Sequence, residues 1–210
     1  MLLTRSRRES FRGFFGAILL DPSPPTESEA AQVYNPNADE KAPEQIGAGG
    51  FLAALEPGAV FPQVELETES GARFVPPRAE TLYGFFKTTC PTSELAWPYF
   101  DRIRRIGARS LAVFAVSQDD RPETARFNER LGIEVETLYD PSPWKASAAL
   151  GLTNVPTFFL VGPGGRIRET VVGFQRPKLE KLAARAAKLA GRHSARLFPI
   201  GQKIPLIVPG

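Results

Sequence analysis

From Thr81 onward, short apolar runs typical of buried strands alternate with amphipathic stretches typical of helices. Residues 81–86 and 111–117 are almost continuously apolar, which is the pattern of strands covered on both faces of a sheet. Between them, after Cys90, one helical face collects four apolar side chains: Leu95, Tyr99, Ile103 and Ile106. Two such strands joined through a helix predict a right-handed βαβ unit, so we expect a parallel strand pair at the centre of an α/β domain.

The rest of the pattern predicts further strands and helices of the same domain. Asp119 and Asp120 supply side chains that cap helix N-termini, and Gly132 is placed to end that helix. Beyond it we expect, in order, a strand over 135–139, a short helix within 144–150, a strand over 157–161, a hairpin turn at 162–165, a strand over 167–174 and a last helix over 177–190. The Gly-rich turn lacks the Lys and Ser or Thr of a phosphate loop, so we interpret it as a hairpin in a mixed sheet.

The parts of the chain outside this pattern differ from it in composition. We expect a basic start and a flexible acidic, Pro-rich linker over residues 1–50, a domain over 51–192 and a C-terminal tail over 193–210. The apolar stretch at 14–20 follows several arginines, like the start of an export signal, but no clear cleavage site comes after it. Because a membrane-spanning helix needs about twenty apolar residues, we expect no integral membrane segment.

Charge and residue counts argue against several classes of function. The formal net charge is +3, and the basic residues of the last helix are typical of a solvent-exposed face. No aromatic-interleaved basic stripe accompanies them, so we expect no nucleic-acid partner. The only histidine, His193, lies beyond the last predicted helix and has no second histidine to pair with. We therefore expect neither a metal nor another cofactor.

The only cysteine, Cys90, lies where the first strand runs into a helix. The unpaired amides and partial positive charge of a helix N-terminus favour the thiolate, which is the reactive form of cysteine. A free cysteine is also among the most buried residue types and can simply fill apolar space. A second feature points toward chemistry: Val155 and Pro156 stand immediately before the very apolar run at 158–161.

In the order and spacing of these features the chain resembles the thioredoxin superfamily, and within it the redoxin branch of TlpA-like thiol-disulfide oxidoreductases and AhpC/TSA peroxiredoxins. The resemblance covers about residues 55–191 and is carried by Cys90, Ser93, Pro98 and Pro156, with the 58–62 segment and Gly71 similar to the opening hairpin of redoxins. It implies a thioredoxin-like three-layer α/β sandwich with a mixed central sheet and an N-terminal redoxin-type hairpin. It also implies that Pro156 is a cis-proline facing a redox-active cysteine.

The chain departs from these families at positions that matter for mechanism. Ser93 replaces the second cysteine of the C-x-x-C motif, giving Cys-Pro-Thr-Ser, and no other cysteine is present to resolve a mixed disulfide, so unaided dithiol exchange is excluded. Tyr83 and Lys87 stand where the peroxiredoxin signature has a proline and a Thr or Ser, which weakens a peroxidase interpretation. Gly84 stands where thioredoxin has a buried acid, so proton handling must differ.

Seven residues around the cysteine are candidates for the site. Those expected to be catalytic are Cys90, Ser93 and Pro156, and those expected to bind substrate are Thr89, Pro91, Thr92 and Val155. Cys90 is the expected nucleophile, Ser93 the expected hydrogen-bond donor to its thiolate, and Pro156 the residue that brings the Val155 backbone close. Three further side chains have two interpretations each: Trp97 and Tyr83 either line a substrate groove or pack in the core, and Lys87 either adds favourable charge or lies at the surface.

The sequence leaves three functions open. The first is a monothiol thioredoxin-like oxidoreductase, in which Cys90 forms mixed disulfides with a protein partner or a low-molecular-weight thiol. The second is a one-cysteine peroxiredoxin-like peroxidase that reduces hydroperoxides through a sulfenic acid. The third is a redox-inactive thioredoxin-fold binding module. A single cysteine slightly favours the cytoplasm, whereas the redoxin resemblance points toward the bacterial envelope or periplasm.

Overall fold

A computed structural model describes residues 54–193, 196–201 and 203–210. The expected basic start and linker over 1–50 lie outside the described residues. In chain order the elements are β1 (Thr81–Phe86), α2 (Pro91–Gly107), a 3₁₀ turn (Ala108–Ser110), β2 (Ala112–Ser117), α3 (Arg121–Leu131), β3 (Glu136–Tyr139), α4 (Lys145–Ala149), β4 (Thr157–Val161), β5 (Ile167–Val172), β6 (Phe174–Gln175), α5 (Arg176–Leu189) and β7 (Ile207–Val208). Strand β7 has no counterpart among the elements expected from the sequence.

Five strands form one mixed sheet in the order β3-β2-β1-β4-β5. Strands β1 and β3 both run parallel to β2, whereas β4 is antiparallel to both β1 and β5. Strand β1 is central, and every one of its residues is buried. The β1-α2-β2 unit therefore has the expected parallel strand pair, and the expected mixed sheet is confirmed.

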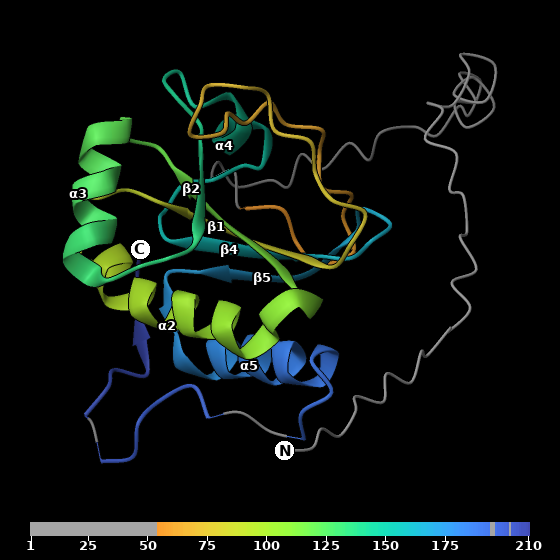
Figure 1. Ribbon diagram of the computed structural model, residues 1–210, viewed down its shortest axis with the longest axis vertical. Coiled ribbons are helices and arrows are strands. Elements are labelled where there is room, and N and C mark those ends of the chain that lie inside the picture. The colour runs from red at the N-terminus through yellow and green to blue at the C-terminus, as the bar shows by residue number, and fades with distance from the viewer. Residues whose placement is uncertain (1–53, 194–195, 202) are drawn as a thin grey trace, which may run out of the picture. The chain divides into compact units, whose positions relative to one another are not determined.

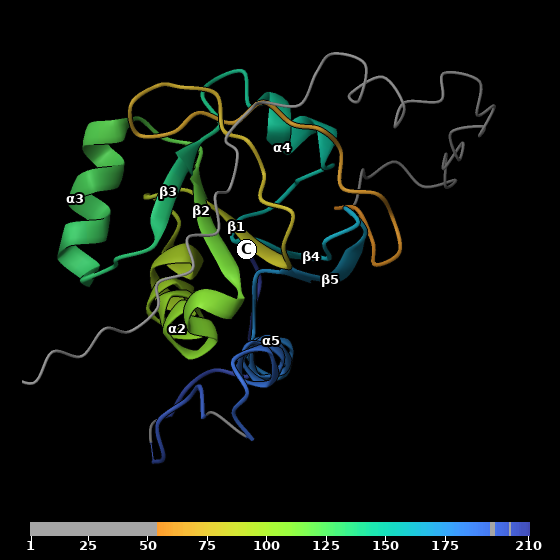
Figure 2. The ribbon, with the colours of Figure 1, turned by 45° about the vertical axis from the view of Figure 1, so that its right-hand side comes forward.

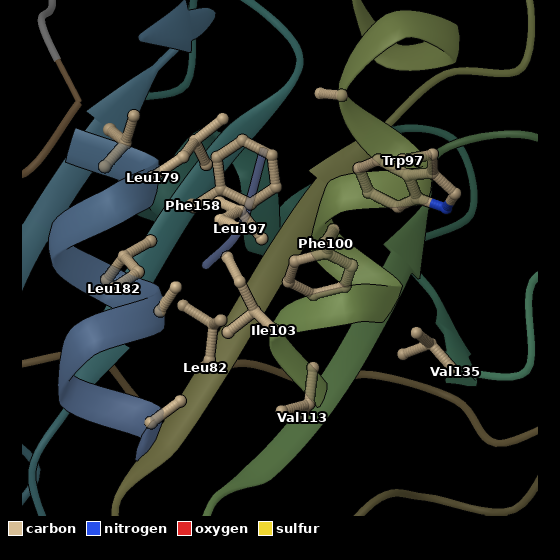
Figure 3. Packing of buried hydrophobic residues seen from close by; sticks show 14 of the residues in the cluster. Leu82, Trp97, Phe100, Ile103, Val113, Val135, Phe158, Leu179, Leu182 and Leu197 are labelled. Atoms are coloured by element: carbon tan, nitrogen blue, oxygen red, sulfur yellow. The ribbon is translucent and has the colours of Figure 1, made fainter. Parts of the chain in front are cut away.

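Helices α2 and α5 lie side by side on one face of the sheet (Figure 1). Phe100 and Ile103 of α2 point toward Leu179 and Leu182 of α5, above Leu82 of the central strand (Figure 3). Helix α3 adds Phe127 to the same core. Burial of these side chains stabilises this face by about 1.5–3 kcal/mol for each fully buried large apolar residue.

Helix α4 lies on the opposite face (Figures 1 and 2) together with the segment that precedes β1. Leu66 and Leu150 pack there against Tyr83 and Phe85 of β1. Successive strand side chains point to opposite faces, so β1 supplies both cores at once. The segment before β1 forms the N-terminal hairpin, in which Glu67 pairs with Arg73 across a turn.

A glycine in β1 allows α2 to approach the sheet closely. A Cβ placed on Gly84 would lie only 2.8 Å from Cζ of Phe100, which is fully buried. The aromatic ring therefore occupies the space above the position where the thioredoxin pattern has an acid. This packing gives Gly84 a structural reason that the sequence pattern alone does not contain.

The segment expected to be a C-terminal tail contacts the domain at two places among its described residues. Leu197 and Phe198 are buried in the core beside α2 and α5. Ile207 and Val208 form β7, which pairs antiparallel with β6. Residues 197–198 and 207–208 thus attach this segment to the domain, the first pair through apolar side chains and the second through a strand edge. Among the described helices, none is both long and apolar enough to cross a membrane.

Candidate active site at Cys90

A short loop separates the end of β1 from Cys90 and places the thiol at the first turn of α2. Cys90 is the N-cap residue, with extended backbone angles (φ −87°, ψ 116°), and Pro91 takes the first helical position, where a missing N–H costs nothing. The Thr88 N–H donates to Asp119 Oδ2 at 2.5 Å, which ties the loop to the end of β2. Of the two acids expected to start α3, Asp120 alone caps that helix.

The thiol points at the loop before β4. Its Sγ–H donates a hydrogen bond to the Val155 carbonyl oxygen, with 3.1 Å between sulfur and oxygen. The peptide bond between Val155 and Pro156 is cis. Cys90 is partly exposed, so the sulfur is not sealed inside the core. Two segments that lie 65 residues apart in the sequence therefore meet at the sulfur atom.

The first turn of α2 offers hydrogen-bond donors that lack an acceptor within the helix. The amides of Thr92 and Ser93 precede the first intrahelical bond, which runs from the Glu94 N–H to Cys90 O at 3.1 Å. The Cys90 side chain does not cap either amide. The Ser93 Oγ is buried and, within the described part of the chain, has no hydrogen-bond partner. The expected bond from Ser93 to the sulfur is therefore not formed in this thiol state, and it stays a prediction for the thiolate.

A pocket of about 460 Å³ opens beside the thiol. Cys90 and Val155 line it together with Lys87, Gln118 and Trp144. Among the described residues that line this pocket, Lys87 carries the only charged side chain. Its Nζ lies 4.4 Å from the centre of the Trp144 ring, a cation–π distance that orients the ammonium group along the pocket wall.

Trp144 is the aromatic residue of the pocket, and the sequence interpretation missed it. Its backbone is left-handed (φ 56°, ψ 52°), a conformation that costs a non-glycine residue about 1–3 kcal/mol. The indole Nε1–H donates to Gln118 O at 3.0 Å, and the buried Asp140 accepts the Ser147 amide at 2.8 Å to fix the start of α4 behind it. A tryptophan in a Pro-rich loop between a strand and a short helix was the signal available in the sequence.

Comparison with known proteins places this arrangement in a fold. No protein-family model matches the chain, and no curated protein matches it. Solved structures do match the chain. A putative thiol:disulfide interchange protein DsbE from Chlorobium tepidum superposes with a TM-score of 0.56 at 19% identity, over 64% of this chain and 99% of that one.

Two further structures agree with it. A putative protein disulfide isomerase from Bacteroides thetaiotaomicron has a TM-score of 0.58 at 12% identity, over 68% of this chain and 95% of that one. The thioredoxin domain of a thiol-disulfide oxidoreductase from Bacteroides vulgatus has a TM-score of 0.55 at 16% identity, over 64% of this chain and 98% of that one. The chain has the thioredoxin fold.

Within this thioredoxin fold, the residues expected to bind substrate separate into three groups. Val155 lines the pocket with Cys90. Thr89 and Pro91 are exposed on the loop and at the start of α2. Thr92 is buried, and its Oγ1–H donates to Pro209 O at 2.7 Å, so its hydroxyl is engaged by the chain itself.

The two aromatic residues with open interpretations both lie in the core of the thioredoxin-fold domain. Trp97 is fully buried against Phe86, and Tyr83 is buried against Phe61 and Phe114. Burial raises the pKa of Tyr83 to about 12, so its phenol stays neutral at physiological pH. Both residues therefore pack the core and leave the groove to Trp144. The described residues contain no cluster of His, Cys, Asp or Glu suited to a metal ion.

Proposed function

We propose that this protein is a monothiol thiol-disulfide oxidoreductase in which Cys90 is the nucleophile. The observation that carries the proposal is the 3.1 Å contact between Cys90 Sγ and Val155 O at the mouth of a pocket and at the start of a helix. A sulfur in this place is partly exposed, adjoins unpaired amide donors and adjoins a backbone segment that can orient a partner. A structural cysteine used only as filler needs none of these three features.

The reactive thiolate needs hydrogen-bond donors, and the resting contact supplies an acceptor. When Cys90 loses its proton, the bond to Val155 O is lost, because a thiolate cannot donate to a carbonyl oxygen. The donors within one helical turn of Cys90 are the amides of Thr92 and Ser93 and the Ser93 hydroxyl, which has no partner in the described part of the chain. We expect a small rotation of the Cys90 side chain to exchange the carbonyl for these donors as the sulfur ionises.

The exchange reaction balances without a second cysteine in the chain. The Cys90 thiolate attacks one sulfur of a partner disulfide, forms a mixed disulfide with it and releases the other sulfur as a thiolate. A thiol from outside the chain, on a protein or a small molecule, then attacks the mixed disulfide. This second step returns Cys90 as a thiolate and leaves the partner oxidised with the incoming thiol.

The proposal is tested by trapping the mixed disulfide. The wild type is mixed with a small disulfide, quenched with acid and analysed by intact mass, with Cys90→Ser as the unreactive control. We expect a single adduct that a low-molecular-weight thiol removes, and we expect Ser93→Cys to release the same adduct without added thiol. An alkylation rate no faster than that of a free cysteine, together with no adduct, would overturn the redox proposal in favour of a binding module.

The same wild-type sample, treated with hydrogen peroxide, distinguishes the peroxidase alternative from thiol-disulfide exchange. If hydrogen peroxide produces a sulfenic acid on Cys90 much faster than on a free thiol, the reaction is peroxide reduction. Tyr83 is buried in the core and Lys87 lies against Trp144, so neither supplies the hydroxyl or proline of the peroxidase signature. One solved structure of this fold, 16% identical with a TM-score of 0.51, is described as a secreted Mycobacterium tuberculosis disulfide oxidoreductase, which gives no support to a cytoplasmic preference.

A further inference from the structure

We propose that residues 203–210, here called the strap, occupy the seat that an extended polypeptide substrate uses at Cys90, so that the chain competes with its own substrate. The proposal rests on the proposed function of Cys90 and names its substrate class: an extended polypeptide that carries a disulfide-bonded cysteine. Small disulfides need only the pocket. Polypeptides need the pocket and the backbone beside it, which the strap covers.

The strap reaches the site by pairing with a strand edge. Val208 pairs antiparallel with Phe174 of β6, and the Arg176 N–H donates to Leu206 O at 2.9 Å. The chain then passes over Gly173, where a Cβ would lie 2.7 Å from Val208 O. Gly173 has a positive φ of 71°, so both its conformation and its missing side chain are required by this passage.

The end of the strap lies on residues that a substrate would contact. The Thr92 hydroxyl donates to Pro209 O at 2.7 Å, and the Asn154 side-chain amide donates to Gly210 O at 2.8 Å. A Cβ placed on Gly210 would lie 2.6 Å from Val155 O, the atom that accepts the Cys90 thiol. Gly210 lines the same pocket as Cys90. An extended chain laid along residues 154–155 would therefore collide with Gly210.

Few apolar contacts hold the strap in place. Leu206 and Ile207 are 62% and 63% exposed, and only Ile204 and Val208 among its described residues are partly buried against the core. Its attachment therefore comes mainly from hydrogen bonds, each of which contributes only a modest net free energy because water replaces it when it breaks. Hydrogen bonds between backbones are also what an incoming extended peptide offers, since it adds to a strand edge in the same way. The strap is thus a segment that a peptide can displace.

The test uses two neighbouring strap residues as a matched pair. Val208→Asp puts an unpaired charge where a partly buried side chain anchors the strap, whereas Ile207→Asp puts the same charge on the exposed neighbour. Two probes with the same thionitrobenzoate leaving group are compared: a seven-residue peptide with one cysteine as the mixed disulfide, and the mixed disulfide of mercaptoethanol. The rate of release of thionitrobenzoate is measured for both.

We expect Val208→Asp to react on the order of fivefold faster with the peptide probe, the scale set by loss of about one net hydrogen bond, while its rate with the small probe stays unchanged. Ile207→Asp should match the wild type with both probes. A free peptide that copies residues 203–210, added in excess, should bring the Val208→Asp rate with the peptide probe back toward the wild-type rate. Equal rates for the two variants with the peptide probe would overturn the proposal, as would an equal acceleration with the small probe.

A second measurement keeps the strap and the redox chemistry separate. Hydrogen exchange of the strap amides is followed in the wild type while a peptide with alanine in place of its cysteine is added. Faster exchange across 206–208 shows that the peptide displaces the strap even if Cys90 proves unreactive. In that case the redox proposal fails, and the proposal that the strap occupies the peptide-binding site holds. If Cys90 reacts rapidly with the small probe but the strap amides keep their protection as the peptide binds, the redox proposal holds and the proposal that the strap occupies the peptide-binding site fails.

Discussion

Replacing Ser93 with alanine should make the protein more stable and its thiol less reactive. The Ser93 Oγ is fully buried without a hydrogen-bond partner among the described residues. Leaving a buried hydroxyl unsatisfied costs about 1–3 kcal/mol, and alanine removes that oxygen while leaving a gap of less than one methyl group. We therefore expect a gain of about 1 kcal/mol in the free energy of unfolding. For a domain of this size that gain raises Tm by about 2–4 °C.

The effect on reactivity has the opposite sign. A hydrogen bond to a charged group contributes about 1.5–3 kcal/mol, so losing the Ser93 donor should by itself slow reactions that need the thiolate by about ten- to a hundredfold. A thiolate with fewer donors is also more nucleophilic, which recovers roughly half of that change on a logarithmic scale. The net expectation is alkylation of Cys90 by iodoacetamide about three- to tenfold slower than in the wild type at neutral pH.

Ser117→Ala is the matched control for the stability measurement. Ser117 is also fully buried, but its hydroxyl bonds Thr124 Oγ1 at 2.7 Å and accepts the Asp119 N–H at 3.1 Å. The same chemical change should therefore lower the stability there by about 1 kcal/mol or more. If Ser93→Ala loses stability as Ser117→Ala does, the Ser93 hydroxyl has a partner. If Ser93→Ala is alkylated as fast as the wild type, Ser93 does not serve the thiolate.

Three other perturbations have expected outcomes. Arg185 donates two hydrogen bonds to Glu80 and so holds the pKa of that buried carboxyl below its usual range. The resulting stabilisation is present above about pH 4.3 and is lost as the pH falls below that value. In urea titrations at a series of pH values the wild type should therefore lose stability in acid more steeply than Glu80→Gln, and equal slopes would contradict this. Gly84→Ala should cost about 1–3 kcal/mol because its Cβ meets the buried Phe100 ring at 2.8 Å; an unchanged thermal midpoint would show that the ring moves freely. Lys87→Met should slow exchange with a carboxylate-bearing disulfide more than with a neutral one, because Lys87 carries the charge of the pocket lining; equal slowing would remove its role in substrate choice.

Elements that depend on local pattern were predictable from the sequence. The bounds of β1 and β4 agree with the apolar runs at 81–86 and 157–161, because a strand buried on both faces requires a continuous apolar sequence. The place of Cys90 at a helix start followed from Pro91 and the strand before it. The meeting of Cys90 with Val155 was inferred from family resemblance, since no local signal in a sequence shows a contact across 65 residues.

The parts that escaped prediction depend on contacts between distant segments. Trp144 looked like a residue of a short helix, and its left-handed backbone and place in the pocket arise from Gln118 and Asp140, which belong to other elements. The strap looked like a tail because Leu206 and Ile207 follow two prolines and a glycine with no periodic pattern. Its order comes from a strand edge on β6 that only the folded domain provides.

The contacts of the site give one sulfur two alternative sets of neighbours. In the thiol state it donates to Val155 O, and in the thiolate state we expect it to turn to the amides of the first helical turn and to the Ser93 hydroxyl. The strap lies against the same Val155 carbonyl through Gly210. A polypeptide that displaces the strap and pairs with residue 155 would therefore compete with the thiol for that carbonyl. Substrate docking and ionisation of Cys90 are then expected to favour each other, so a bound peptide without cysteine should speed alkylation of Cys90 in the wild type, and a slower rate would show that docking only shields the sulfur.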